Sequence, residues 1–155
     1  MSLENTFYQI KAAEVQIAGL YSLISLSVSI TQPALSDLFK ELADEEMMHS
    51  RQIELLQSIF QQAKENFKEE LRAENIIAVF LQNVETVKRY FNQKHLELKP
   101  GDLINLALDL EHNLLEKHNT FFMNVTDPKI KQLFASLNLA DEAHIKKLEN
   151  WPKDR

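Results

Sequence analysis

The chain has 155 residues, enough for one domain with a hydrophobic core, and it is rich in good helix formers, with only two glycines and four prolines. Its formal charge is −6 with acidic and basic residues mixed, which argues against nucleic acid as a partner. It has no cysteine, which excludes disulfides, thiolate metal sites and thiol catalysis. Since two glycines leave little material for hairpin turns, we expect an all-α fold in one domain over residues 1–155.

The sequence predicts no association with a membrane. No apolar run approaches the roughly 18 residues that cross a bilayer. The first residues, Met-Ser-Leu-Glu-Asn, lack the basic start and apolar stretch of a secretory signal. We therefore expect a cytoplasmic protein.

The first predicted helix covers about residues 4–30 and carries Glu14 in the middle of an apolar face. Thr31-Gln32-Pro33 ends this helix, because a proline disfavours helical conformation in the residue before it. Pro33 itself suits the start of the next helix.

The second predicted helix covers about residues 34–65 and carries Glu46 and His49. These residues are three positions apart, so both side chains lie on one helix face. That face also carries apolar residues, namely Phe39, Leu42, Ile53, Leu56 and Phe60. A carboxylate and an imidazole therefore point towards a core, which is unfavourable unless a compensating group meets them.

A long connection follows, over about residues 66–100. Its amphipathic part, residues 75–92, predicts a short helix or two, whose apolar side could either form a dimer contact or cover the rest of the fold. Asp102 is the predicted N-cap of the third long helix, about 102–125.

The third and fourth predicted helices repeat the arrangement of the first two. Glu111 and His118 lie on the inner face of the third, and Asp127-Pro128 starts the fourth, about 128–150. Two antiparallel helix pairs with short turns, joined by one long crossover, have the connectivity of a ferritin-like four-helix bundle rather than an up-down-up-down bundle.

The two halves of the sequence share a pattern of polar residues. Each half has a lone acid on its first helix, a tyrosine or histidine seven residues later, and an acid three residues before a histidine on its second helix. In the first half these residues are Glu14, Tyr21, Glu46 and His49. In the second half they are Glu111, His118, Asp141 and His144.

Folding the halves around a pseudo-twofold axis brings together six candidate metal ligands. They are Glu14, Glu46, His49, Glu111, Asp141 and His144. Four carboxylates carry a charge of about −4, which two divalent cations neutralise, and iron or manganese suits oxygen and imidazole ligands. The alternative is a plain bundle in which the inward acids are protonated or paired with lysine.

These motifs resemble those of the rubrerythrin branch of the ferritin-like superfamily. Residues 14–21 resemble its first-helix motif, Glu-x-Gln followed by Tyr, and residues 42–49 resemble its second-helix motif. Residues 110–112 and 139–144 resemble its third-helix and fourth-helix motifs. The similarity covers about residues 10–150 apart from the crossover.

The resemblance implies a four-helix bundle around a non-haem di-iron centre, with manganese or a mixed pair of metals as the alternative to two iron ions. It implies that Glu46 bridges the two metals together with Glu111 or Asp141. It also implies that His49 and His144 each bind one metal.

The resemblance is incomplete in the second half. Leu114 stands where rubrerythrins have a further glutamate, and Asp141 stands where glutamate is usual. Tyr21 and Glu45 are candidates for hydrogen bonds to ligands, Glu45 to a histidine of the opposite half. His118 is a candidate for the same role or for an additional ligand.

Rubrerythrins usually carry a rubredoxin domain with paired cysteines, and this chain has none, so electrons are expected from a separate donor such as a rubredoxin. The implied function is redox chemistry with hydrogen peroxide or dioxygen. The alternatives are an iron-binding or iron-handling protein without turnover and a metal-free helical interaction module. A second copy of the chain is a further candidate partner.

Overall fold

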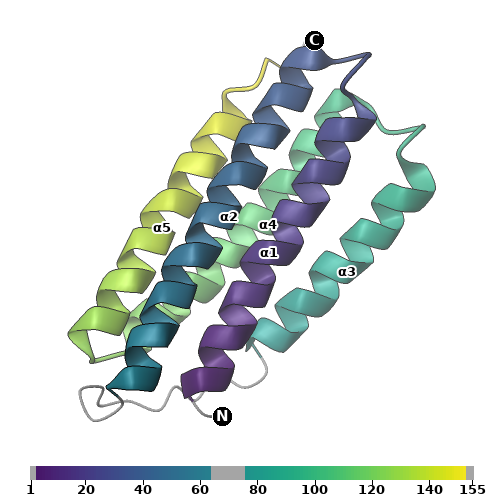
Figure 1. The fold of residues 1–155 in the computed structure, drawn as a ribbon. Coiled ribbons are helices and arrows are strands. Elements are labelled where there is room, and N and C mark those ends of the chain that lie inside the picture. The colour runs from purple at the N-terminus through teal and green to yellow at the C-terminus, as the bar shows by residue number, and fades with distance from the viewer. Residues whose placement is uncertain (1–2, 64–75, 153–155) are drawn as a thin grey trace.

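A computed structural model describes residues 3–63 and 76–152, and within them the fold is all-α, with five helices and no strand (Figure 1). The helices are α1 (Leu3–Ser27), α2 (Pro33–Gln62), α3 (Ile76–Lys94), α4 (Pro100–Asn124) and α5 (Pro128–Glu149). The all-α prediction is therefore confirmed. α2 ends at Gln62, about three residues before the predicted end near residue 65, and residue 65 itself lies outside the described residues.

The helices run back and forth along one axis. α1 and α2 form one antiparallel pair, and α4 and α5 form another (Figure 1). α3 returns the chain to the end where α2 began, so that α4 runs in the same direction as α2 (Figure 1). α3 packs against α1 and α4, and α5 packs against α2. Across the described part of the chain, every helix lacks the combination of length and hydropathy that crossing a membrane requires.

Prolines and one capping side chain define the helix starts. Pro33, Pro100 and Pro128 each occupy the first turn of a helix, where the missing N–H leaves no hydrogen bond unmade. The Asp127 carboxylate caps α5 by accepting hydrogen bonds from the backbone N–H of Lys129 at 2.9 Å and of Ile130 at 3.3 Å. The predicted boundary at Asp127-Pro128 is confirmed.

The predicted N-cap role of Asp102 is wrong. α4 begins at Pro100, so Asp102 lies inside its first turn, where its carboxylate accepts a hydrogen bond from the backbone N–H of Lys99 at 2.9 Å. An acid at this position still complements the partial positive charge of the helix N-terminus. The prediction failed because Pro100 was assigned to the turn and not to the first helical position.

The helix in the connection is longer than predicted. α3 is one continuous helix of 19 residues, not a short piece. Its apolar residues Ile77, Phe80, Val84 and Phe91 recur at helical spacing, and all four are buried. This face therefore covers the rest of the fold, which was one of the two alternatives for it.

Buried apolar side chains form two clusters on either side of a polar layer. One cluster includes Phe39 and Leu103, and the other includes Phe7 and Phe134. On α2 and α5, the inward acid and histidine lie between residues of the two clusters. On α1 and α4, Glu14 and Glu111 are flanked on both sides by residues of the first cluster. The polar layer is therefore enclosed by apolar walls, where an uncompensated charge is costly.

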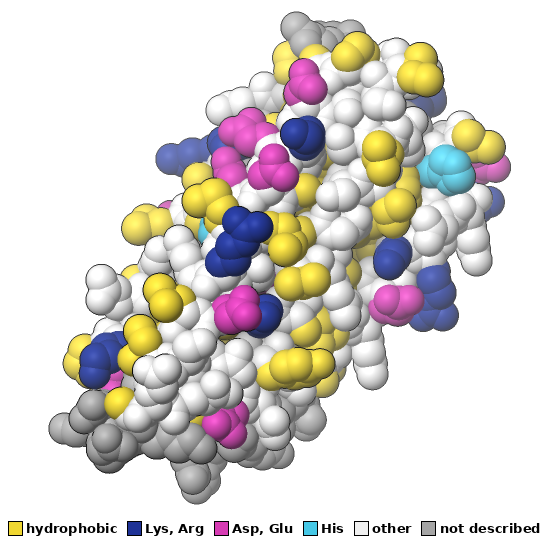
Figure 2. All heavy atoms as spheres, in the orientation of Figure 1, with side chains coloured by type: hydrophobic (Ala, Val, Ile, Leu, Met, Phe, Trp, Pro, Cys, Tyr) yellow, Lys and Arg dark blue, Asp and Glu magenta, His cyan; other side chains and the backbone are white. Residues whose placement is uncertain are grey.

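The outer surface mixes apolar and charged side chains. Figure 2 shows hydrophobic side chains along the face formed by α1 and α2, with acidic and basic side chains between them. Large apolar side chains exposed on these two helices include Tyr8, Leu26, Met48 and Leu55. Exposed apolar residues of this kind are ordinary on helices, so they do not test whether a second copy of the chain is a partner.

Candidate metal centre

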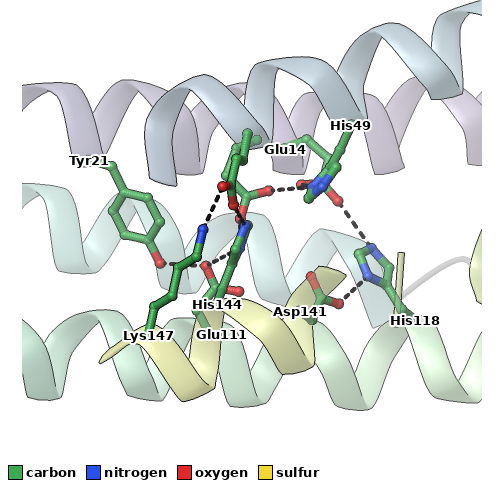
Figure 3. Close-up of polar contacts among 10 residues, drawn as sticks. Glu14, Tyr21, His49, Glu111, His118, Asp141, His144 and Lys147 are labelled. Atoms are coloured by element: carbon green, nitrogen blue, oxygen red, sulfur yellow. Dashed lines mark hydrogen bonds and ion pairs between the residues drawn. The ribbon is translucent and has the colours of Figure 1, made fainter. Parts of the chain in front are cut away.

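Side chains from α1, α2, α4 and α5 converge in one buried cluster between the helices (Figure 3). The structure brings together all six residues expected as metal ligands, namely Glu14, Glu46, His49, Glu111, Asp141 and His144. The four carboxylates have no exposed surface. Each lies on the apolar stripe of its helix, so the packing that buries the stripe also buries the acid.

The ligand atoms fall into two groups that share Glu46. One group consists of Glu14, Glu46 and His49. The other consists of Glu46, Glu111, Asp141 and His144. Within each group the ligand atoms lie within 4.8 Å of one another. Ligands about 2.1 Å from a common ion lie at most about 4.2 Å apart, so modest contraction around a cation would complete either group.

Glu46 contacts a histidine from each half of the chain. Its Oε2 lies 3.2 Å from Nδ1 of His49, and its Oε1 lies 2.9 Å from Nδ1 of His144. His49 Nδ1 also lies 3.7 Å from Glu14, and His144 Nδ1 lies 3.3 Å from Glu111. The two oxygens of Glu46 therefore face the two halves separately.

Tyr21 and His118, which occupy matching positions in the two halves, each reach across to the acid of the other half. The Tyr21 hydroxyl donates a hydrogen bond to Oε1 of Glu111 at 2.8 Å. His118 Nε2 lies 3.3 Å from Oε1 of Glu14, and its Nδ1 lies 2.6 Å from Oδ2 of Asp141. Both were expected near the ligands, and Figure 3 shows their side chains pointing into the cluster.

The outer nitrogen of His144 is held by Glu45. His144 Nε2 lies 2.6 Å from Oε2 of Glu45, so this acid contacts a histidine of the opposite half, as the sequence suggested. Lys147 donates hydrogen bonds to Glu45 at 2.6 Å and to Glu41 at 2.8 Å. Burial opposes ionisation of Glu45, but Lys147 and His144 lower its pKa overall.

Sequence reasoning did not identify Lys147 as part of this arrangement. The available signal was its position three residues after His144, on the same face of α5. That spacing does not reveal that Glu45 of α2 faces this part of α5, because the relative register of two helices is a property of the tertiary packing.

The cluster carries more negative charge than its surroundings compensate. Within the described part of the chain, no lysine or arginine is among the buried residues, so only histidines lie with the buried acids. Burying an ionised carboxylate costs roughly several kcal/mol, and the whole stability of a domain is about 5–15 kcal/mol. Four buried acids can therefore remain only if protons or metal cations neutralise them.

In the absence of a cation, Glu14, Glu111 and Asp141 hold protons more tightly than usual. Burial, reinforced by repulsion from Glu46, raises the pKa of Glu14 to about 8. Burial also raises the pKa of Glu111, and it raises that of Asp141 well above its ordinary value. The free energy of these acids is therefore lower when they share protons or meet a positive ion.

The pKa values of the two histidines that face Glu46 are also raised, but by neighbouring carboxylates and against the effect of burial. Burial lowers the pKa of His49, but the carboxylates of Glu14 and Glu46 outweigh it and raise this pKa to about 10. Burial likewise opposes protonation of His144, whose pKa is raised to about 11 by Glu111 and Glu46. His118 differs, because burial lowers its pKa more than the nearby acids raise it.

Several buried atoms of the cluster have no hydrogen-bond partner. They are both carboxylate oxygens of Glu14, Oε1 of Glu46, Oε2 of Glu111, Oδ1 of Asp141, Nε2 of His118 and Nδ1 of His144. Buried polar atoms are rarely left in this state, and here they converge on one place. A donor set of four carboxylates and two imidazoles fits iron or manganese. These buried residues could therefore hold a metal ion.

Comparison with models of protein families, with curated proteins and with solved structures finds no match to this chain. The resemblance to rubrerythrins therefore depends on the short motifs alone.

Proposed function

We propose that this chain is a carboxylate-bridged di-metal protein of the ferritin-like, rubrerythrin type. In this proposal α1, α2, α4 and α5 form the four-helix bundle, and α3 belongs to the long crossover. The ligands are the six residues Glu14, Glu46, His49, Glu111, Asp141 and His144. Two iron ions are the expected occupants, with manganese or a mixed pair as the alternative.

The position of Glu46 is the observation that carries this proposal. Its two oxygens face His49 and His144, and it belongs to both groups of candidate ligands. A plain helical bundle with chance inward acids gives no reason for one carboxylate to lie between two histidines, each with its own further acid. A pair of cations on either side of Glu46 would explain both groups and would neutralise the buried charge.

The proposed activity is oxidation of the reduced centre by hydrogen peroxide or dioxygen. Two adjacent redox-active metals can deliver the two electrons that reduce a peroxide bond, and the protein residues hold and insulate them. His49 is the most exposed of the six ligands, at 8 %, so the cluster is almost closed to solvent. Such narrow access suits a small oxidant, and the electrons would come from a separate protein such as a rubredoxin.

The test is repeated turnover of the iron-loaded protein. We expect one addition of hydrogen peroxide to oxidise the anaerobic Fe²⁺ protein rapidly, as followed by its ultraviolet absorption. We then expect a reductant to return it to the starting spectrum over many cycles. A matched Glu46→Gln variant should lose both the absorption change and peroxide consumption. Peroxide consumption equal in the two proteins would refute the proposal.

The second candidate is an iron-handling protein without turnover. It is favoured by the absence of cysteine, since no iron–thiolate electron donor of the rubredoxin kind is present in the chain. In the same experiment this function predicts one stoichiometric oxidation followed by release or slow exchange of the ferric iron. Equilibrium dialysis of the oxidised protein against an iron chelator would detect that release.

A further inference from the structure

His118 is the buried histidine of the cluster that the six-ligand arrangement leaves unused. It lies on α4, has no exposed surface, and faces α1 on one side and α5 on the other. Its Nδ1 lies 2.6 Å from Oδ2 of Asp141, whereas its Nε2 has no hydrogen-bond partner. Figure 3 shows the ring between Asp141 and the Glu14–His49 side of the cluster.

The contact between His118 and Glu14 has the length expected for two ligands of one metal. His118 Nε2 and Glu14 Oε1 are 3.3 Å apart, and neither atom has a hydrogen-bond partner. Two ligands about 2.1 Å from one ion are about 3.0 Å apart when adjacent in an octahedron and about 3.4 Å apart in a tetrahedron. Glu14 in turn faces His49 through its other oxygen, at 3.7 Å.

Asp141 supplies the orientation that a metal-binding histidine needs. A histidine that binds a metal through one ring nitrogen usually donates its other N–H to a carboxylate or carbonyl. The carboxylate of Asp141 lies at that distance from Nδ1 of His118, which leaves Nε2 as the nitrogen that points at Glu14. The other oxygen of Asp141, Oδ1, has no hydrogen-bond partner, and Asp141 belongs to the group of candidate ligands that contains His144.

We propose that His118 is a third imidazole ligand, binding through Nε2 the cation held by Glu14, Glu46 and His49. Its Nε2 now contacts Glu14 and lies outside the group of ligand atoms within 4.8 Å of one another, so binding requires the ring to move towards Glu46 and His49. This inference rests on the proposed di-metal function and adds to it that the two metal positions are unequal. The first position has two imidazoles and two carboxylates. The second has one imidazole, that of His144, and the carboxylates of Glu46, Glu111 and Asp141. The first therefore favours metals late in the divalent series, and the second favours manganese or iron.

Stepwise titration of the metal-free protein with Co²⁺ tests this asymmetry. We expect two binding steps by calorimetry, with the tighter one assigned to the position that includes His118. His118→Gln should weaken the tighter step by about 100-fold or more, because loss of a ligand exceeds the 10–100-fold effect of losing a residue that supports one. The other step should change little. His112→Gln is the matched control, because it makes the same substitution at an exposed position of the same helix and should spare both steps.

The number of imidazoles bound to the metal gives a second readout. Its deciding measurement uses the unmodified protein and so does not depend on whether the variant folds. X-ray absorption of the unmodified protein with one equivalent of Co²⁺ should show two coordinated imidazoles, and His118→Gln should show one. If the unmodified protein binds two cobalt ions but shows one imidazole in this state, the inference about His118 is wrong while the di-metal proposal stands. If the unmodified protein binds no cobalt, iron or manganese, the di-metal proposal fails and this inference fails with it.

Discussion

The α1–α2 half and the α4–α5 half supply the cluster with the same pattern of residues but surround it differently. The first half provides Glu14 and the pair Glu46 and His49. The second half provides Glu111 and the pair Asp141 and His144. The positions on the helices match, and all six side chains are buried together. The repeated spacing therefore accounts for the placement of the acids and histidines.

The contacts around those residues are not repeated. Tyr21 donates a hydrogen bond to Glu111, whereas its counterpart His118 lies between Glu14 and Asp141. Glu45 contacts His144, and its counterpart in the second half is Ala140, which has no polar side chain. Each half thus supports acids or histidines of the other half, so neither half forms a complete site alone.

Glu46 and Asp141 occupy equivalent positions and have different surroundings. Glu46 belongs to both groups of candidate ligands, whereas Asp141 belongs to one. The aspartate side chain is shorter by one methylene, and one of its oxygens lies 2.6 Å from His118. A shorter side chain and a contact with His118 therefore give Asp141 surroundings that differ from those of Glu46.

The largest effect is expected from Glu46→Ala. Because this carboxylate lies between both histidines, its loss should weaken metal affinity at both positions by about 100-fold or more. Asp141→Ala should reduce metal affinity at the first position much less. Elemental analysis after gel filtration measures the bound metal. The control is Glu54→Ala, an exposed acid on the same helix that pairs with Lys11. Equal metal content in the Glu46 and Glu54 variants would contradict the proposal that Glu46 is a metal ligand.

Metal removal should reverse the dependence of stability on pH. The folded pKa values are raised to about 8 for Glu14, about 10 for His49 and about 11 for His144. The folded metal-free chain thus binds more protons than the unfolded chain, and its stability should fall as pH rises from about 5 to 9. Metal binding requires deprotonated ligands, so bound metal should stabilise more at the higher pH, by about 2.7 kcal/mol at 100 times the dissociation constant.

Urea unfolding across this pH range, with and without a chelator, measures both slopes. A metal-free protein that becomes more stable as the pH rises would contradict the assignment of protons to the buried acids and histidines.

Tyr21→Phe should affect the second half although the residue lies in the first. The change removes the hydrogen bond to Glu111, and leaving that buried acid less satisfied should reduce the free energy of unfolding of the metal-free protein by about 1–3 kcal/mol. Tyr8→Phe, on an exposed side chain of the same helix, is the control. Thermal unfolding of the two variants measures the difference, and equal stability would show that the Tyr21 contact contributes little.

The smallest effect is expected from Glu45→Gln. This substitution keeps the length of the side chain but removes the charge that holds Nε2 of His144, so affinity at the position of His144 should fall by about 10-fold. Glu41→Gln is matched to it, because Glu41 also contacts Lys147 but not His144. Calorimetric titration of both variants with metal separates an effect through His144 from an effect through Lys147. Equal metal affinities in the two variants would show that the contact between Glu45 and His144 does not affect metal binding.

The periodicity of the sequence predicted the long helices and the residues on their inner faces, because a helix face is fixed by spacing alone. Pro33 and Asp127-Pro128 marked helix starts for local steric and hydrogen-bonding reasons. The convergence of Glu14, Glu46, Glu111 and Asp141 followed from the repeat, because each acid stands at an equivalent level of an inward face.

The contacts between helices could not be predicted in the same way. That His118 faces Asp141, and that Lys147 faces Glu45, depends on the axial register of neighbouring helices, which spacing within one helix does not determine. The partner of the apolar face of α3 could not be predicted either, because that face could pack against the remaining helices or against a second chain. Burial of Phe80 and Phe91 decides for the former.

Anomalous X-ray scattering from crystals of the protein expressed with ample iron tests the central claim most directly. The account predicts two anomalous peaks on either side of the Glu46 carboxylate, one nearer His49 and one nearer His144, at about 2.0–2.3 Å from their ligands. Absence of any peak in the cluster, with the six residues neutralised by protons or by hydrogen bonds among themselves, would contradict it.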